Sequence, residues 1–256
     1  IKMSKNLYME KIGKKAKLAS LHLSNVNINK RNSVLKQFSQ YLKTNSQLIL
    51  SSNKKDIFRA KSKKIKDSMI DRLKLSNKKI AQMRNSIEEI IRFKDPVGKT
   101  LSSWKRPNGL IIKRVSIPIG VIGVIYESRP NVTSDVSALC FKTGNVVILR
   151  GGSEAFHSNK ILAKLFKRAL KKKKCDENCV QFIESKDRNH VDYLLSSMKN
   201  YIDVIIPRGG KGLVKKVLKK STISIIGHYE GLCHVYVDRE ADLSMAIKVV
   251  KNSKMR

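Results

Sequence analysis

The apolar residues of the first third of the chain recur at the spacing of amphipathic helices. The clearest stretch runs from Ile80 to Ile91, and Ser76 stands before it as the expected N-cap. Asp95-Pro96 should end this block, because a residue that precedes proline is driven out of the helical region. We therefore predict that residues 3–94 form a helical N-terminal part of the protein.

The pattern changes after residue 96. Asn108-Gly109 lies between two extended segments, which predicts a β-hairpin over residues 97–116. Beyond the hairpin, apolar β-branched runs alternate with helical stretches, which predicts an α/β fold with a parallel sheet covered on both faces. The expected strands are 117–126, 146–149, 180–183, 201–206, 223–226 and 234–237. The expected helices are 132–142, which should end at Gly144, and 154–172, 188–199, 213–220 and one from about 241.

The charge of the chain raises a second class of function. Its 256 residues include 54 Lys and Arg against 20 Asp and Glu, a net charge of +34. Such a field could attract nucleic acid. However, the basic residues are spread through the chain, and aromatic residues make up only 6% and are not interleaved with the basic runs. We therefore expect no nucleic-acid partner and keep a basic nucleic-acid-binding protein as the alternative.

Membrane segments, disulfides and metal sites are not expected. No apolar run reaches the roughly 18 residues of a membrane helix, and no apolar leader is visible near residue 1. Four cysteines are too few for a disulfide scaffold, and no second pair with metal spacing accompanies Cys175 and Cys179. Cys233 precedes an alternating strand and should be buried. We expect a cytoplasmic protein with reduced thiols.

The end of the first predicted strand carries residues suited to an anionic substrate. Ligands of open α/β sheets bind at the carboxyl ends of the strands. Here Glu127, Arg129 and Asn131 could hold an anion and stabilise a developing oxyanion. In the competing interpretation, Asn131 or Thr133 acts only as the N-cap of the following helix.

Two further strand ends carry glycines, which permit a close approach of the backbone to a ligand. At the first of these ends, Arg150 could pair with a phosphate, and Ser153 or Glu154 could bind a ribose hydroxyl; an ordinary βα turn would explain this segment equally well. The other segment precedes a helix N-terminus, where free N–H groups and the helix dipole form an anion site. The two segments are Arg150-Gly151-Gly152-Ser153-Glu154 and Arg208-Gly209-Gly210-Lys211-Gly212.

Segments 117–133, 142–159, 206–210 and 227–238 closely resemble the γ-glutamyl phosphate reductase family, also called glutamate-5-semialdehyde dehydrogenase. The resemblance implies an α/β fold of the aldehyde dehydrogenase superfamily. In that fold, residues 117–256 would form a Rossmann-like NADP-binding domain that stops just before the catalytic domain, which would be truncated. The hairpin over 97–116 would resemble the arm that joins protomers in a homo-oligomer.

The resemblance also implies a reaction, the second step of proline biosynthesis from glutamate. NADPH would reduce L-glutamyl 5-phosphate to L-glutamate 5-semialdehyde, with release of phosphate, through a cysteine thioester. Glutamate 5-kinase would be a functional partner. Another acyl-reducing member of the superfamily is the alternative within this class.

Residue roles follow from the same resemblance. Arg129 and Asn131 should point toward the reacting carbonyl, with Glu127 also on the substrate side. The cofactor should contact Arg150, Gly151, Gly152, Ser153, Glu154, Arg208, Gly209, Gly210 and Gly212, with Arg150 at the 2′-phosphate and the last three glycines at the pyrophosphate. In the family, the nucleophilic cysteine follows the segment that ends at Arg256. None of the four cysteines here takes its place, so we expect these 256 residues to be inactive alone.

Overall fold

The centre of the protein is a four-stranded parallel sheet with the strand order β5-β4-β3-β6. The computed structural model describes residues 2–127, 129–185, 187, 189–227 and 233–255. The strands are β3 (Val121–Tyr126), β4 (Val146–Gly151), β5 (Val180–Phe182) and β6 (Val204–Arg208). Their register places Tyr126 opposite both Gly151 and Arg208, so three predicted ligand segments begin at the same edge of the sheet.

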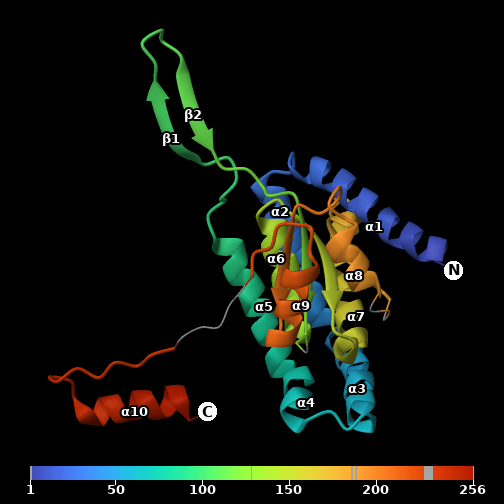
Figure 1. Cartoon of the computed structure of the whole chain (residues 1–256), viewed down its shortest axis with the longest axis vertical. Coiled ribbons are helices and arrows are strands. Elements are labelled where there is room, and N and C mark those ends of the chain that lie inside the picture. The colour runs from blue at the N-terminus through green and yellow to red at the C-terminus, as the bar shows by residue number, and fades with distance from the viewer. Residues whose placement is uncertain (1, 128, 186, 188, 228–232, 256) are drawn as a thin grey trace.

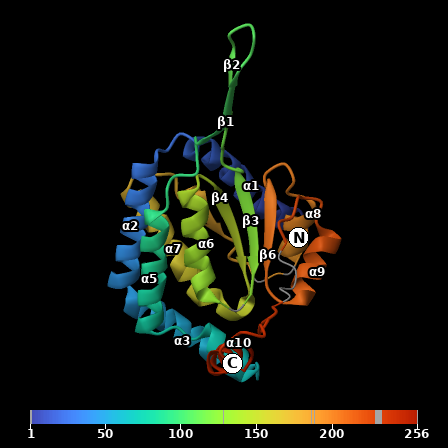
Figure 2. The same cartoon turned by 90° about the vertical axis from the view of Figure 1, so that its left-hand side faces the viewer.

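Helices cover both faces of this sheet (Figure 2). On one face lie α6 (Pro130–Lys142) and α7 (Phe156–Lys172), and on the other lie α1 (Lys2–Leu23), α8 (Asn189–Ser196) and α9 (Lys211–Lys220). Every residue of β3 and β4 is buried, as a sheet covered on both faces requires. The predicted α/β fold with a parallel sheet covered on both faces is therefore confirmed.

Helices α2 to α5 form an outer layer over α6 and α7. They are α2 (Ile28–Thr44), α3 (Ser46–Ser62), α4 (Asp67–Leu73) and α5 (Asn77–Arg92). The helical prediction for this region is confirmed, and the Ser76 hydroxyl accepts the Lys79 N–H at 3.2 Å as the N-cap of α5. Every helix among the described residues is too short or too polar to cross a bilayer.

A buried carboxylate joins this outer layer to the sheet domain. Asp56 of α3 is 1% exposed and accepts the backbone N–H groups of His157 at 3.0 Å and Ser158 at 2.7 Å, together with the Ser158 hydroxyl at 2.7 Å. These N–H groups belong to the first turn of α7, where backbone N–H groups have no carbonyl acceptor within their own helix. Asp56 therefore acts as an N-terminal cap supplied from 101 residues away in the sequence.

Two glycines align the start of β3 with β4. Gly144 follows α6 with a φ of +75°, and the N–H of Asn145 donates to the carbonyl of Cys140 at 2.8 Å, so the predicted glycine stop is confirmed. Gly120 has a φ of +122°, and its N–H donates to Asn145 Oδ1 at 2.9 Å. Asp203 then accepts the Val121 N–H at 2.8 Å.

The predicted hairpin projects from the body of the protein (Figure 1). Strands β1 (Thr100–Lys105) and β2 (Ile111–Val115) pair antiparallel, and Gly109 in the turn has a φ of +87°. Nearly all of its residues are exposed, including Trp104 and Ile111. The hairpin is thus confirmed as an element, and its outer edges are open for pairing.

The prediction is wrong in the last part of the chain. Residues 223–226 form only an isolated bridge between Ile205 and Ile225, and residues 234–237 form no strand within the described segment 233–255. Cys233 is exposed rather than buried. Alternation of apolar and polar residues yields a strand only where a neighbouring edge is available, and β6 pairs outward at a single position. Helix α10 (Leu243–Lys254) contains no buried residue and lies apart from the sheet in Figure 1.

Some element boundaries also differ. The predicted helix from residue 154 begins as a 3-10 turn, η1 (Ser153–Ala155), before α7, and a second such turn, η2 (Glu177–Cys179), precedes β5. The strand expected over 201–206 starts only at Val204. Arg188, expected to begin a helix, lies outside the described residues, and α8 starts at Asn189.

Candidate functional site

A cavity of about 440 Å³ lies at the carboxyl edge of the sheet, between the ends of β3 and β4 and the start of α9. It brings together seven of the residues that the sequence singled out: Glu127, Arg150, Gly151, Gly152, Ser153, Glu154 and Gly212. We call it the strand-end cavity. Because it contains glycines, a hydroxyl, a carboxylate and a guanidinium, its lining can bind both sugar hydroxyls and phosphate.

Arg150 is the most unusual group in the strand-end cavity. Its side chain is almost fully buried, at 6% exposure, and donates to the carbonyl of Gly151. Its Nε is buried and has no hydrogen-bond partner among the described residues. Burial lowers the pKa of Arg150, and the nearby Glu154 opposes this shift. A buried guanidinium with an unused donor is suited to an anionic ligand such as a phosphate.

The glycine-rich segment before α9 contributes one of its predicted cofactor residues to the strand-end cavity. Gly212 lines the strand-end cavity, but Arg208, Gly209 and Gly210 do not. Instead, the N–H of Gly210, the N-cap of α9, donates to Glu127 Oε2 at 2.9 Å. The Glu127 carboxylate therefore lies where the helix N-terminus would attract a pyrophosphate. This also places Glu127 in the strand-end cavity, apart from the other two residues predicted on the substrate side.

The prediction from the sequence did not include some residues that line the strand-end cavity. Ile65 and Met69 come from the α3–α4 region, and no local pattern connects them with a strand end 60 residues later. Lys216 follows Gly212 by four residues on α9, so helical spacing placed both on one face and could have identified it. Its Nζ lies 3.1 Å from Asp192 Oδ1.

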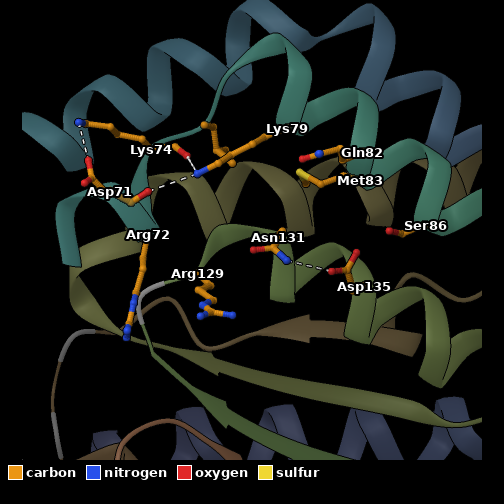
Figure 3. Close-up of a pocket in the computed structure, with 11 residues that line it drawn as sticks. Asp71, Arg72, Lys74, Lys79, Gln82, Met83, Ser86, Arg129, Asn131 and Asp135 are labelled. Carbon is orange, nitrogen blue, oxygen red and sulfur yellow. Dashed lines mark hydrogen bonds and ion pairs between the residues drawn. The ribbon is translucent and has the colours of Figure 1, made fainter. Parts of the chain in front are cut away.

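A second cavity, of about 410 Å³, lies on the other side of the loop after β3 (Figure 3). It is bounded by α4, α5 and the start of α6, and we call it the α4–α6 cavity. It contains Arg129 and Asn131, the two residues predicted to face the reacting carbonyl. The loop between β3 and α6 thus contributes Glu127 to one cavity and Arg129 and Asn131 to the other.

The competing interpretation of Asn131 and Thr133 as N-caps is wrong. The N-cap position of α6 is Arg129, and no side chain caps it. Asn131 Nδ2 instead donates to Asp135 Oδ2 at 3.1 Å. Thr133 is buried, and its hydroxyl lies 2.7 Å from the Tyr126 hydroxyl and donates to Asn159 Oδ1 at 2.9 Å. Asn131 therefore lines the α4–α6 cavity with its amide bonded to Asp135, and the second N–H of that amide is not used in this hydrogen bond.

The α4–α6 cavity is rich in charge. Its lining includes four cations and two carboxylates, a net charge of +2: Arg72, Lys74, Lys79, Arg129, Asp71 and Asp135. Burial raises the pKa of Asp135, while its hydrogen bonds from Asn131 and Ser134 oppose the shift. This composition is suited to a small ligand that is anionic overall.

Neither cavity is lined by a cysteine. Burial raises the pKa of Cys140 to about 12 and also raises the pKa values of Cys175 and Cys179, so these thiols are poor nucleophiles at neutral pH. Within the described residues, no group of three or more His, Cys, Asp or Glu side chains could hold a metal ion.

A parallel sheet covered on both faces, with glycines, a helix N-terminus and a buried guanidinium at its carboxyl edge, defines an α/β protein of the dinucleotide-binding class. The model of the aldehyde dehydrogenase family matches residues 2–256, and the chain belongs to that family. Proteins of this family use nicotinamide dinucleotides as cofactors.

Within the family, the chain is similar to γ-glutamyl phosphate reductases. It is 45% identical over 249 residues to that of Clostridium tetani, which covers 97% of this chain and 58% of the relative. The crystal structure of the Thermotoga maritima γ-glutamyl phosphate reductase superposes with a TM-score of 0.91 at 39% identity, over 97% of this chain and 60% of that one. The Saccharomyces cerevisiae counterpart gives a TM-score of 0.80 at 32% identity, over 96% and 62%. The chain thus spans about three-fifths of these relatives, and the predicted resemblance is confirmed.

Proposed function

We propose that this chain forms the cofactor- and substrate-binding part of an NADPH-dependent enzyme that reduces L-glutamyl 5-phosphate to L-glutamate 5-semialdehyde, with release of phosphate, in proline biosynthesis. The observation that carries the proposal is the strand-end cavity, with its buried Arg150, in a chain 45% identical over 249 residues to a γ-glutamyl phosphate reductase. The α4–α6 cavity on the other side of the β3–α6 loop provides a separate place for the substrate.

The residues of the strand-end cavity fit a dinucleotide phosphate. Ser153 and Glu154 would bind the adenosine ribose, and the unused Nε of Arg150 would meet its 2′-phosphate, which favours NADPH over NADH. Gly212 and the N-terminus of α9 would hold the pyrophosphate, once the hydrogen bond from the Gly210 N–H to Glu127 has broken. When bound, the nicotinamide supplies the hydride of the reduction.

The covalent step needs a nucleophile that the two cavities do not contain. A cysteine thiolate would attack the acyl phosphate, expel phosphate and form a thioester. Hydride addition to the thioester carbonyl would give a hemithioacetal, whose C–S bond would break to release the aldehyde and return the thiolate. Asn131, at the start of α6, would donate a hydrogen bond to the oxyanion, and Arg129 would orient the anionic substrate. No cysteine lines either cavity, so we place the nucleophile outside these 256 residues and expect them to bind ligands without turnover.

The partners of the proposed enzyme follow from chemistry and from the hairpin. Acyl phosphates hydrolyse readily, so a kinase that phosphorylates glutamate, glutamate 5-kinase, should supply the substrate directly. The open edges of β1 and β2, with Trp104 and Ile111 exposed, are suited to pairing with another copy in a homo-oligomer. Four free cysteines fit a reducing compartment, and we place the enzyme in the cytoplasm.

Cofactor binding is tested by titrating the chain with NADPH and following nucleotide fluorescence, with NADH in parallel. Gly212→Asp adds a carboxylate to the strand-end cavity where a Cβ meets no atom within 4 Å, so the fold should tolerate it. We expect this variant to weaken NADPH binding at least tenfold. Lys219→Asp is the control, because it changes more charge on the same helix outside the cavity.

The reaction is tested in a chimera in which the chain is joined to the C-terminal part of the Thermotoga maritima relative. Phosphate-dependent reduction of NADP⁺ by glutamate 5-semialdehyde should appear in the chimera, and the chain alone should lack it. Tight binding of duplex DNA at physiological salt without NADPH binding would overturn the proposal in favour of a nucleic-acid-binding protein. A chimera that acts only on another acyl phosphate or on acyl-CoA would assign it to another acyl-reducing class.

A further inference from the structure

The α4–α6 cavity contains a carboxylate without a cationic partner. Asp135 is half-buried, and its only described partners are Asn131 at 3.1 Å and Ser134 at 3.4 Å. No ion pair among the described residues includes it, although the chain carries a net charge of +34. Lysines and arginines outnumber carboxylates by more than two to one, so an unpaired, desolvated Asp in this chain indicates a position kept open for a cationic ligand.

Two cations of the same cavity are likewise without partners. Arg72 of α4 and Arg129 of the β3–α6 loop form no side-chain hydrogen bond or ion pair within the described part of the chain, and Figure 3 shows their side chains extending in the same direction. The other charged groups are occupied: Lys74 pairs with Asp71 at 2.7 Å, and Lys79 Nζ donates to the carbonyl of Lys74 at 2.6 Å.

We propose that the α4–α6 cavity recognises the amino-acid end of the acyl phosphate, with Asp135 as the residue that binds the α-ammonium group and Arg72 and Arg129 as the residues that bind the anionic groups. The inference rests on the proposed function, because it assigns specificity to the same reaction. It makes Asp135 a specificity-determining residue.

Charge complementarity supports this assignment. A γ-glutamyl phosphate combines a dianionic phosphate, a carboxylate and an ammonium group, a net charge of −2, and the cavity has a net charge of +2. A ligand that carries both charges also needs binding groups of both charges, and Asp135, Arg72 and Arg129, which form no ion pair among the described residues, supply both. Because Arg129 and Asn131 lie two residues apart at the start of α6, neighbouring residues would bind the amino-acid end and the reacting carbonyl.

An ammonium receptor of this kind works chiefly by rejection. An acyl phosphate that lacks the α-amino group would leave the Asp135 carboxylate facing anionic groups without a counter-charge. A site built to pair with a polar group rejects the analogue lacking it far more strongly than a merely apolar site would. The cavity would therefore distinguish the γ-glutamyl compound from simple acyl phosphates of the same length.

In the absence of substrate, the ionised Asp135 carboxylate lowers the stability of the folded chain. Burial raises the pKa of Asp135, which shows that its ionised form is disfavoured in the folded chain. Residues that lower the stability of the free protein and lack an oppositely charged neighbour are characteristic of binding sites. Asn131 holds the carboxylate in place through Oδ2 at 3.1 Å, and among the described residues Oδ1 accepts only the longer hydrogen bond from Ser134 at 3.4 Å, so Oδ1 retains a lone pair for a ligand.

The test compares two stable ligands by calorimetry on the full chain: a phosphonate analogue of L-glutamyl 5-phosphate and the same phosphonate without the α-amino group. The wild-type chain should prefer the amino compound at least tenfold, about the effect of one charge-assisted hydrogen bond. Asp135→Asn should abolish that preference. Asp67→Asn, the same change at an exposed position of α4 outside the cavity, should preserve it.

The ratio of the two affinities separates recognition from damage to the fold, because a structural defect would weaken both ligands alike. Retention of the preference in Asp135→Asn, or failure of both phosphonates to bind a chain that still binds NADPH, would overturn the inference and leave the proposed function in place. If the wild-type chain does not bind NADPH, that result would instead count against the proposed function itself.

Discussion

Replacing Asp56 with alanine should destabilise the protein and weaken cofactor binding together. The substitution removes a carboxylate that is 1% exposed and accepts the N–H groups of His157 and Ser158 and the Ser158 hydroxyl. The hydroxyl can rotate toward another acceptor, but the two backbone donors cannot. They lose the Asp56 acceptor at the start of α7, directly after the Ser153–Glu154 segment of the strand-end cavity.

The size of the effect follows from these contacts. Each unsatisfied, largely buried donor costs about 1–2 kcal/mol, and loss of a negative charge at a helix N-terminus adds about 0.5 kcal/mol. We therefore expect the free energy of unfolding to fall by about 3 kcal/mol, which corresponds to roughly 6–12 °C in Tm for a chain of this size. Asp67→Ala, an exposed residue in the first turn of α4, should change it by less than about 0.5 kcal/mol.

Urea unfolding followed by circular dichroism at 222 nm measures this difference. Tryptophan fluorescence is unsuitable, because Trp104 lies on the exposed hairpin and would not report the contact between α3 and α7. NADPH titration of the same variants tests the effect on the strand-end cavity. A fall of less than about 1 kcal/mol for Asp56→Ala would refute the assignment of Asp56 as the cap of α7.

Four further predictions concern single groups. Glu127→Gln should raise NADPH affinity several-fold in fluorescence titrations, because it removes the charge that competes for the Gly210 N–H; unchanged affinity would contradict this. Gly120→Ala, whose Cβ would lie 2.3 Å from Asp203 Oδ2, should cost about 3 kcal/mol in urea unfolding, against about 1 kcal/mol for Gly98→Ala, which meets no atom within 4 Å. Iodoacetamide should modify Cys233 in the native chain and reach Cys140 and Cys179 only after unfolding, as peptide mass spectrometry would show. Asp135→Asn should stabilise the chain at pH 7, and because the folded state raises the pKa of Asp135, the advantage over wild type should shrink as thermal melts are carried to pH values below that pKa.

Local patterns were sufficient for most of the individual elements. The N-cap at Ser76, the glycine stop at Gly144 and the Asn108-Gly109 turn each depend on a few neighbouring residues, and the structure confirms all three. The position of residues 150–154 at a strand end was also predicted from a buried apolar run followed by glycines, and the structure places these residues in the lining of the strand-end cavity. The prediction of a strand over 234–237 was wrong, because a strand also needs a neighbouring sheet edge to pair with, which a local pattern does not specify.

The amino-acid sequence by itself determined the class of fold, the position of the ligand edge and the family, because these depend on periodicity, turn residues and contiguous motifs. Only the tertiary structure decided how the β3–α6 loop divides its side chains, with Glu127 capping α9 on one side and Arg129 and Asn131 facing α4 and α5 on the other. It also placed Arg72 and Asp135 in the lining of one cavity and brought Asp56 to the start of α7. Such pairings join residues 60 to 100 positions apart, and their free energy depends on burial and distance, which no local pattern contains.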